Sequence, residues 1–600
     1  MFQTFETTAD PGAGPGRLAA LRSRLAQEGF AGMLVPRADA HQGEYVAEHD
    51  QRLAWLTGFT GSAGFCVVLP DIAGVFVDGR YRTQVKAQVD LAAFTPVPWP
   101  ETRPGPWIAA QLPDGGRIAF DPWLHTVKEI AEIEAALEGT DIRLVAAANA
   151  VDAIWPDQPP PPCGPVSIQP AAFAGEDAAA RRARIGAILA NAGQRAAVLT
   201  LPDSIAWLLN IRGSDVPRNP VVQAFAILYS DGRVDLFVDA AKLSEAVRTH
   251  LGPEVAVQDP SEFPAALGRV EGPVRVDRAT APVAVSTALE AAGTAVVWGD
   301  DPCLLPKARK NAAEIAATTE AHLRDGAAMV EFLAWFDREA PKGGLTEIAV
   351  VRALEGFRRA TNALLDISFD TICGAGPNGA IMHYRVTEAT DRPIRAGELV
   401  VVDSGAQYID GTTDITRTLA VGDPGPEARE AFTRVLQGMI AISRLRWPVG
   451  LAGAHLDALA RYPLWLAGQD YDHGTGHGVG VHLCVHEGPA RISRVSDVPL
   501  EPGMILSNEP GYYREGAFGI RIENLVLVEE APPLVDPQRR WLAFRTLTFV
   551  PIDRRLIVAS MLSQGERDWL NAYHAEVRAA IGPRVSAEAR DWMLALTEPI

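Results

Sequence analysis

A run of four prolines, Pro159–Pro162, interrupts this 600-residue chain. Proline fixes the backbone angle φ and has no amide hydrogen, so the run cannot continue a helix or a central strand and favours a stiff, extended connection. A second break follows in the sequence DPCLLPKARK, residues 301–310. The two breaks predict three domains, over residues 1–155, 166–305 and 306–600.

The first two predicted domains read as weak copies of one unit. Each opens with a basic amphipathic stretch that ends at glycine, over residues 17–29 and 181–193. In both, an apolar strand, a Trp-Leu segment and a strand ending in Phe-Val-Asp follow in the same order. Alternating helix and strand patterns predict an α/β fold for both copies. Two copies are too few for a solenoid, so we interpret the pattern as a duplication.

The two copies differ directly after the last of these strands. The first continues as DGRY with Arg80, whereas the second continues as DAAK. A scaffold needs no arginine there, which makes Arg80 a candidate functional residue. An arginine in a solvated turn is the plain alternative.

The third domain begins with a helical pattern over residues 311–340, in which apolar residues recur every three or four positions. Strand-like runs separated by glycine turns continue to about residue 530. The last 45 residues or so predict a helical C-terminal extension.

Composition excludes several classes of protein. Apolar residues make up 48% and charged residues 22%, which is ordinary globular usage and argues against a disordered chain, a fibre or a coiled coil. A net charge of −19 disfavours nucleic acid as the main partner. The sequence has no signal-peptide pattern and no apolar run of membrane-spanning length, so we expect no membrane association. Five dispersed cysteines without a CxxC pair suit a reducing cytoplasm.

The densest chemical signal is a cluster of histidines. Four of the twelve lie between His473 and His486, in DHGTGHGVGVHLCVH. His473 and His477 are four residues apart, but the glycines between and after them disfavour a helix, which excludes a zincin-type pair. The Gly-x-Gly spacing lacks the full dinucleotide fingerprint with its following helix. We therefore expect a glycine-rich loop or strand edge that presents imidazoles.

Two aspartates precede this cluster on a predicted hairpin. The apolar strand 399–402 leads directly into Asp403, and an Asp-Gly turn signal separates it from Asp414. Each aspartate alone would be an ordinary turn or edge residue. On one hairpin the two carboxylates could face each other.

Two glutamates follow the cluster in unusual settings. Glu509 comes after an apolar strand and before a Pro-Gly turn, and Glu523 is expected inside a strand with apolar neighbours. Burying a bare carboxylate costs several kcal/mol, so Glu523 must be paired, hydrogen-bonded or bound to a metal. An ion pair with Arg521 is the plain alternative, which the opposite faces of adjacent strand residues disfavour.

Together these residues predict a metal centre of four carboxylates and one imidazole: Asp403, Asp414, His477, Glu509 and Glu523. Mostly oxygen ligands suit hard divalent ions such as Mn²⁺, and one histidine permits Co²⁺ or Zn²⁺. Four carboxylates are too many for one catalytic ion with open positions. They suit two ions about 3.5–4 Å apart.

The motifs in this order resemble those of the pita-bread metallopeptidases, and among them the cytosolic three-domain Xaa-Pro aminopeptidases (aminopeptidase P). The resemblance spans the whole chain and rests on these segments: DAHQGEY, TGFTGSAG, DGRY, NIRGSDV, GPNGAIMHY, DSG…TTDITRT, HGTGHGVG, VHEGP, NEPGYY and GIRIEN. It implies two duplicated creatinase-like α/β domains and a pita-bread catalytic domain of α+β type. The loop around EATDRP, from Glu388, and the proline run look peculiar to this chain.

By resemblance, each candidate residue takes a role. Asp403 would bind one metal ion, His477 and Glu509 the other, and Asp414 and Glu523 would bridge both. The resemblance implies further roles for four residues, with His383 and His486 contacting the substrate at the scissile bond, His473 lining the pocket and Arg80 reaching the peptide from the first domain.

The implied activity is hydrolysis of an N-terminal Xaa-Pro bond by a hydroxide that bridges the two ions, with Glu509 as proton shuttle. The expected partners are peptides with proline in second position and a second copy of the chain. The alternatives are a prolidase-like Xaa-Pro dipeptidase, a creatinase-like hydrolase that would not need all five ligands, and a non-catalytic binding module on the same fold.

Overall fold

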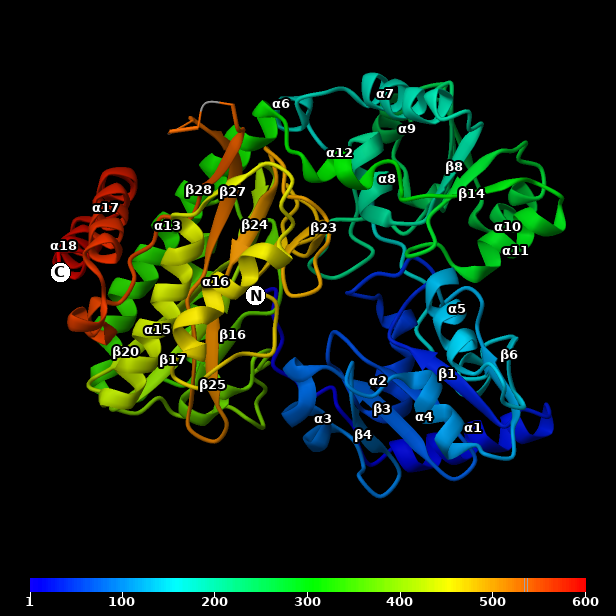
Figure 1. Cartoon of the computed structure of the whole chain (residues 1–600), viewed down its shortest axis with the longest axis horizontal. Helices are drawn as coiled ribbons and strands as arrows, with labels where there is room; N and C mark the ends of the chain where they lie inside the picture. Colours follow the sequence, from blue (N-terminus) through cyan, green and yellow to red (C-terminus); the bar gives the residue numbers. More distant parts are fainter. Residues whose placement is uncertain (534, 537) are drawn as a thin grey trace. The chain divides into compact units, whose positions relative to one another are not determined.

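The computed structural model describes residues 1–533, 535–536 and 538–600. These residues form two compact units (Figure 1), which we call the N-terminal unit, Thr8–Lys307, and the C-terminal unit, Met1–Thr7 with Ala308–Ile600. The first seven residues therefore belong to the unit that holds the C-terminal half of the chain. Within the described residues, no helix combines the length and apolar character needed to cross a membrane.

The N-terminal unit contains two six-stranded mixed sheets. In the first the strand order is β4-β3-β2-β1-β5-β6. Its strands are β1 (Gly32–Pro36), β2 (Phe65–Val68), β3 (Ala73–Val77), β4 (Thr95–Pro98), β5 (Gly116–Phe120) and β6 (Ile142–Ala146). Its helices are α1 (Gly14–Gln27), α2 (Arg52–Thr57), α3 (Arg82–Gln88), α4 (Pro104–Gln111) and α5 (Val127–Ala136).

The second sheet repeats this topology in the order β12-β11-β10-β8-β13-β14. Its strands are β8 (Ala196–Leu199), β10 (Phe225–Tyr229), β11 (Val234–Phe237), β12 (Val255–Gln258), β13 (Val274–Val276) and β14 (Val296–Trp298). The helices of this half are α6 (Ala171–Ala174), α7 (Ala178–Asn191), α8 (Pro202–Leu209), α9 (Glu245–Leu251), α10 (Phe263–Leu267), α11 (Val283–Ala291) and α12 (Leu304–Ala308). Antiparallel and parallel pairs also fall at the same places in both sheets, as a duplication predicts.

Strand alternation explains why helices cover both faces of the first sheet. Met33 and Val35 of β1 pack into a core with α1 and α2, whereas Leu34 packs into a second core with α4 and α5. Successive side chains on a strand point to opposite faces, so a strand that is apolar throughout must be covered on both.

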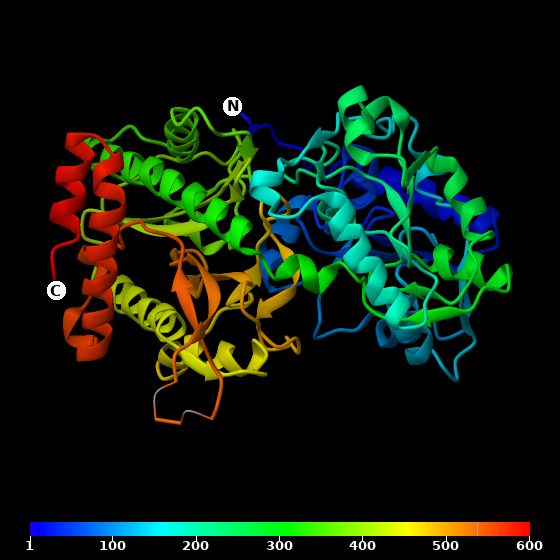
Figure 2. The same ribbon diagram turned by 90° about the horizontal axis from the view of Figure 1, so that it is seen from above.

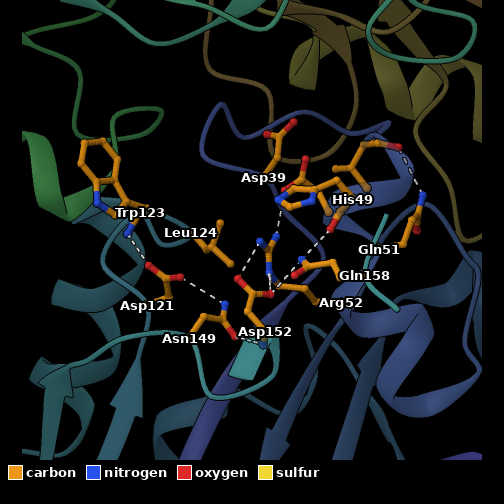
Figure 3. Close-up of polar contacts among 12 residues, drawn as sticks. Asp39, His49, Gln51, Arg52, Asp121, Trp123, Leu124, Asn149, Asp152 and Gln158 are labelled. Carbon is orange, nitrogen blue, oxygen red and sulfur yellow. Dashed lines mark hydrogen bonds and ion pairs between the residues drawn. The ribbon is translucent and has the colours of Figure 1, made fainter. Parts of the chain in front are cut away.

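The connection that follows the first sheet is anchored by several polar contacts. Gln158, directly before the proline run, donates hydrogen bonds to Asp152 Oδ1 at 3.1 Å and to the His49 carbonyl at 3.0 Å. Asp152 also forms a bidentate ion pair with Arg52, at 2.6 and 3.0 Å (Figure 3). The His49 Nδ1 atom lies 2.6 Å from the Pro159 carbonyl oxygen. The extended segment is therefore bound to the first α/β half.

The C-terminal unit is built on long helices and two larger sheets, ordered β16-β17-β20 and β21-β28-β27-β24-β22-β23. The helices are α13 (Ala312–Glu339), α14 (Glu347–Arg359), α15 (Pro426–Ser443), α16 (Ala454–Trp465), α17 (Gln564–Ile581) and α18 (Ala587–Leu596). The strands of the two sheets are β16 (Ile372–Ala375), β17 (Glu398–Ser404), β20 (Ile415–Val421), β21 (Arg446–Pro448), β22 (Gly476–Gly478), β23 (Glu487–Ile492), β24 (Ile505–Asn508), β27 (Asn524–Ala531) and β28 (Trp541–Thr546). Short strands complete the unit: β15 (Asp366–Ile367), β18 (Ala406–Tyr408), β19 (Gly411–Thr412), β25 (Gly511–Arg514) and β26 (Phe518–Arg521).

Helices enclose these strands from two sides. Figure 2 shows α13 and α14, in green, on one side of the strands and α15 and α16, in yellow, on the other. The helices α17 and α18 of the predicted extension both contact α13. Their residues Leu570 and Met593 share a buried core with Phe432 of α15.

Candidate metal centre

The predicted aspartate hairpin is present. Strands β17 and β20 pair antiparallel with Asp403 opposite Thr416, and Asp414 directly precedes β20. Asp410 of the Asp-Gly signal lies in the turn between β18 and β19, and Gly411 begins β19, where it pairs with Tyr408. The hairpin therefore brings both aspartates to one end of the sheet, and both side chains are buried.

The glycine-rich segment forms the short strand β22, which carries His477. A Cβ atom at Gly476 would lie 2.0 Å from the Ser507 carbonyl oxygen, so only glycine permits this close approach to β24. The His477 Nδ1 atom lies 3.0 Å from the Gly478 carbonyl and donates to it. This bond fixes the tautomer and turns Nε2 toward the carboxylates, 3.4 Å from both Asp414 Oδ2 and Glu509 Oε1.

The two glutamates enter from different strands. Glu509 directly follows β24 and accepts a hydrogen bond from Ser507 Oγ at 3.1 Å. Glu523 accepts one from Thr416 Oγ1 at 2.7 Å. The expectation that Glu523 lies inside a strand is wrong in detail, because it occupies the break between β26 and β27.

The negative charges of the carboxylates in this cluster repel one another. Burial and the charges of neighbouring carboxylates raise the pKa of Asp414 and of Glu523 well above the ordinary range. Burial also raises the pKa of Glu509, against the lowering effect of His477. Several buried carboxylates at short distance are costly unless a cation joins them.

Two observations indicate that divalent cations fit this cluster. One oxygen each of Asp403 and Glu523 is buried and has no hydrogen-bond partner among the described residues. Asp414, His477 and Glu523 also offer ligand atoms that all lie within 4.8 Å of one another. Buried acceptors without donors, together with an imidazole lone pair, form a ligand set typical of hard or borderline divalent ions.

Sequence reasoning missed the part that Arg521 plays. Arg521 Nη2 lies 2.6 Å from Asp403 Oδ2, so its ion pair is with Asp403 and not with the neighbouring Glu523. It also donates to Tyr513 OH at 2.6 Å and to the Met382 carbonyl at 3.2 Å. In the sequence, the motifs GIRIEN, NEPGYY and GPNGAIMHY mark Arg521, Tyr513 and Met382.

Two of the predicted histidines have contacts that place them at the cluster, and the third follows a residue bound by Arg521. The ring of His486 lies 4.3 Å from that of His477, centroid to centroid. His473 approaches Tyr513 OH at 2.9 Å through Nε2 and Glu509 Oε2 at 3.9 Å through Nδ1. His383 directly follows Met382, whose carbonyl is bound by Arg521.

The one predicted site residue outside this cluster is Arg80. It lies in the N-terminal unit, in the 3₁₀-helix η2 (Gly79–Tyr81), and pairs with Asp78 at 2.7 Å.

Comparison with protein-family models covers most of the chain. Residues 316–530 match metallopeptidase family M24, and residues 540–600 match the C-terminal region of that family. Residues 17–154 and 157–314 each match a creatinase/prolidase N-terminal domain. The fold class predicted from the sequence, two duplicated creatinase-like domains before a pita-bread domain, is confirmed.

Individual relatives show to which group within the family the chain is similar. An aminopeptidase P2 of Arabidopsis thaliana is 38% identical over 97% of this chain and 88% of its own. An Xaa-Pro aminopeptidase 2 of Sus scrofa is 35% identical over 97% and 89%. The crystal structure of a Caenorhabditis elegans X-prolyl aminopeptidase, described as cytosolic with a di-nuclear active site, has a TM-score of 0.93 at 33% identity and covers 98% of this chain and 99% of its own.

The fold and the carboxylate cluster therefore define a metallopeptidase of family M24. Within that family, the chain belongs to the three-domain Xaa-Pro aminopeptidases. This confirms the predicted family and class of enzyme.

Proposed function

We propose that this enzyme releases the first residue from peptides whose second residue is proline, and that five side chains of the C-terminal unit hold two divalent ions for the reaction. The observation that carries the proposal is the buried cluster of Asp403, Asp414, Glu509, Glu523 and His477, with its two orphaned oxygens and raised carboxyl pKa values. An uncharged ligand would leave the repulsion between the buried carboxylates in place, whereas bound cations would remove it.

In this proposal Asp403 would hold one ion, His477 and Glu509 would hold the other, and Asp414 and Glu523 would be shared by both. Bound there, the ions would supply a water of near-neutral pKa and polarisation of the scissile carbonyl. We propose Mn²⁺ as the ion, because oxygen donors dominate the set. Metal analysis of the purified protein, and recovery of activity with each ion after chelation, test this choice.

The side chains around the cluster divide the remaining work. Glu509, whose pKa is raised by burial, takes a proton from the attacking water and returns it to the leaving amine. His383 and His486 donate hydrogen bonds to the oxygen on which charge develops. His473 lines the pocket, where its contact with Tyr513 OH at 2.9 Å fixes the ring. Arg521 holds Asp403 in place through their ion pair at 2.6 Å.

Arg80 is proposed to bind the peptide. The duplication supports this role, because the capping of the 3₁₀-helix needs only the aspartate: Asp78 accepts from the Arg80 amide at 3.0 Å, and Asp239 accepts from the Ala241 amide at 2.8 Å in the second copy. The second copy thus keeps the local structure without the guanidinium. Formation of the turn therefore does not require the arginine.

We expect Arg80→Ala to raise KM or lower kcat/KM by about 10- to 100-fold, since a charged hydrogen bond is worth about 1.5–3 kcal/mol. Metal content and the thermal unfolding temperature should stay unchanged. Steady-state kinetics on tri- and tetrapeptides measure the effect. Ala241→Arg at the equivalent place in the second copy is the matched control. Wild-type kinetics of Arg80→Ala on all peptides would return Arg80 to the role of a solvated turn residue.

The alternative activity is that of an Xaa-Pro dipeptidase. An Xaa-Pro dipeptidase of Bacillus anthracis shares 25% identity and a TM-score of 0.50, but covers only 63% of this chain. The Caenorhabditis elegans aminopeptidase covers 98%. The additional part of the chain, which the dipeptidase does not cover, therefore favours the aminopeptidase.

A substrate panel decides between the two activities. We expect cleavage of Xaa-Pro-Yaa to exceed that of Xaa-Pro and of Xaa-Ala-Yaa by about 100-fold or more, because proline offers a fixed φ and no amide hydrogen for the site to match. One assay with all three peptides under one condition measures this. Preference for the dipeptide would establish a prolidase, and equal rates on the alanine peptide would reject proline specificity.

We also propose a cytoplasmic homodimer that associates through the C-terminal unit. All five cysteines are free, which suits a reducing compartment. Large apolar side chains in the second half of α16 and at its C-cap are exposed, namely Leu459, Tyr462, Trp465 and Leu466. Clustered exposed apolar residues are typical of association surfaces. Sedimentation of the purified protein tests the dimer, and a monomer at micromolar concentration would exclude it.

A further inference from the structure

The loop that carries His383 is closed at its base by one buried carboxylate. Glu347, the first residue of α14, is fully buried. Its Oε1 accepts from the Ala375 amide at 2.7 Å, before the loop, and its Oε2 accepts from Tyr384 OH at 3.0 Å, directly after His383. Asn378, within the loop, donates to both oxygens at 3.0 Å. One carboxylate thus fixes both ends of the loop and its middle.

The segment that looked peculiar in the sequence, residues 388–393, packs against the same point. Tyr384 OH lies 3.1 Å from the Thr390 carbonyl, and the Ile348 amide donates to Asp391 Oδ1 at 3.0 Å. The Glu347 amide donates to the Arg392 carbonyl at 3.2 Å. The segment therefore supports the start of α14 and the tyrosine that follows His383.

The other side of His383 is held independently. Arg521, which pairs with Asp403, donates to the Met382 carbonyl at 3.2 Å. His383 thus lies between two residues whose positions are fixed: Met382, which is bound by Arg521, and Tyr384, which is bound by Glu347. Together the two anchors restrict where its imidazole can lie.

Burying a carboxylate costs free energy, which a purely structural role at this position would not require. The backbone amide, side-chain amide and hydroxyl that donate to the Glu347 carboxylate are all neutral, and burial raises its pKa to about 7. An apolar core residue would often be more stabilising there. What the carboxylate supplies is two acceptor oxygens that bind three donors at once, which an amide with a single acceptor oxygen cannot do.

We propose that Glu347 is a positioning residue for His383: by tying Ala375, Asn378 and Tyr384 to one point, it sets the position of the imidazole at the scissile bond. The inference rests on the proposed function, in which His383 contacts the substrate.

Glu347→Gln tests the proposal. The amide group would face at least one donor, which loosens the loop, and a displacement of about 1 Å can cost about 100-fold in rate. We expect kcat to fall by about 10- to 100-fold, with KM changed less than 3-fold and metal content unchanged. Glu355→Gln is the matched control. Glu355 lies on the same helix and is also buried, but it bonds to the Phe2 amide at 2.9 Å and to Arg359 at 2.7 Å. This control should keep its rate within about 2-fold.

A double-mutant cycle separates positioning from general support of the fold. In a His383→Ala background, Glu347→Gln should cause no further loss of rate, because its effect runs through the missing imidazole. Additive losses would overturn the proposal. If Glu347→Gln does not fold, Tyr384→Phe removes one of the donors and leaves the charge. It should lower kcat in the same direction by a few-fold, and a wild-type rate for it would equally overturn the proposal.

Hydrogen exchange supplies a readout that does not depend on activity. Amides of residues 376–384 should exchange at least about 10-fold faster in Glu347→Gln than in wild type or Glu355→Gln. Unchanged exchange would overturn the positioning role even if the enzyme cleaves Xaa-Pro peptides. If exchange is faster in Glu347→Gln but the wild type lacks Xaa-Pro activity, the proposed function is rejected, while the role of Glu347 in holding the loop is supported.

Discussion

Asp414→Asn should lower the rate of Xaa-Pro-Yaa cleavage by at least about a thousandfold, because one side chain serves both proposed ions. Asparagine keeps the shape of the side chain but loses a ligand charge within 3.4 Å of His477 Nε2. Because the pKa of Asp414 is raised in the fold, its ionised form destabilises the metal-free protein at neutral pH. The metal-free variant should therefore unfold at the same temperature as the wild type or higher, while the stabilisation by added Mn²⁺ disappears.

The control for this prediction lies on the same hairpin. Asp410 is also buried, but it pairs with Arg324 at 2.9 Å and lies outside the predicted ligand set. Asp410→Asn should retain the response to Mn²⁺. Exhaustive chelation should abolish activity of the wild type, and added Mn²⁺ should restore it. Activity that survives chelation would contradict a metal centre altogether.

Glu509→Gln should produce the second large effect, a fall in kcat of about a thousandfold with little change in KM. The glutamine carbonyl can still face the ion, and Ser507 Oγ, now 3.1 Å from Glu509 Oε1, can still donate to it. The amide cannot, however, take up a proton. Stopped assays on Xaa-Pro-Yaa, with metal content measured on the same sample, separate loss of the proton carrier from loss of the ion.

Glu529→Gln is the matched control for that substitution. Glu529 lies on β27 and pairs with Arg545 at 2.6 Å at the surface, away from the cluster. The kcat of Glu529→Gln should equal that of the wild type. Near-normal kcat of Glu509→Gln with both ions bound would reject the assignment of Glu509 as the proton carrier.

The sequence was sufficient to predict features that depend on local pattern. The Asp-Gly turn placed Asp403 and Asp414 on one hairpin, and the glycines around His477 were enough to exclude a helix there. The sheets of the two α/β halves likewise follow from one repeated order of helices and strands.

Pairing over long sequence distances was not predictable in the same way. The ion pair of Arg521 with Asp403 joins residues 118 positions apart, and no local pattern selects that partner. The break at Glu523 arises because the chain changes partner there, from β25 on one side to β24 on the other. Apolar residues stand on both sides of the change, so the segment reads as one strand, although the alternation shifts by one position at Glu523 and Asn524. Glu347 gave no signal at all, because an acidic residue at the start of a helix is ordinary.

The placement of the first residues in the C-terminal unit has a consequence for synthesis on the ribosome. The Phe2 amide bonds to Glu355, 353 positions later, and Phe5 enters the buried core around α13 and α14. At typical elongation rates the partner emerges roughly 20–70 s after the segment itself. The opening residues must therefore stay available through the whole synthesis of the N-terminal unit. The C-terminal unit thus completes its core with residues that are synthesised before the whole N-terminal unit.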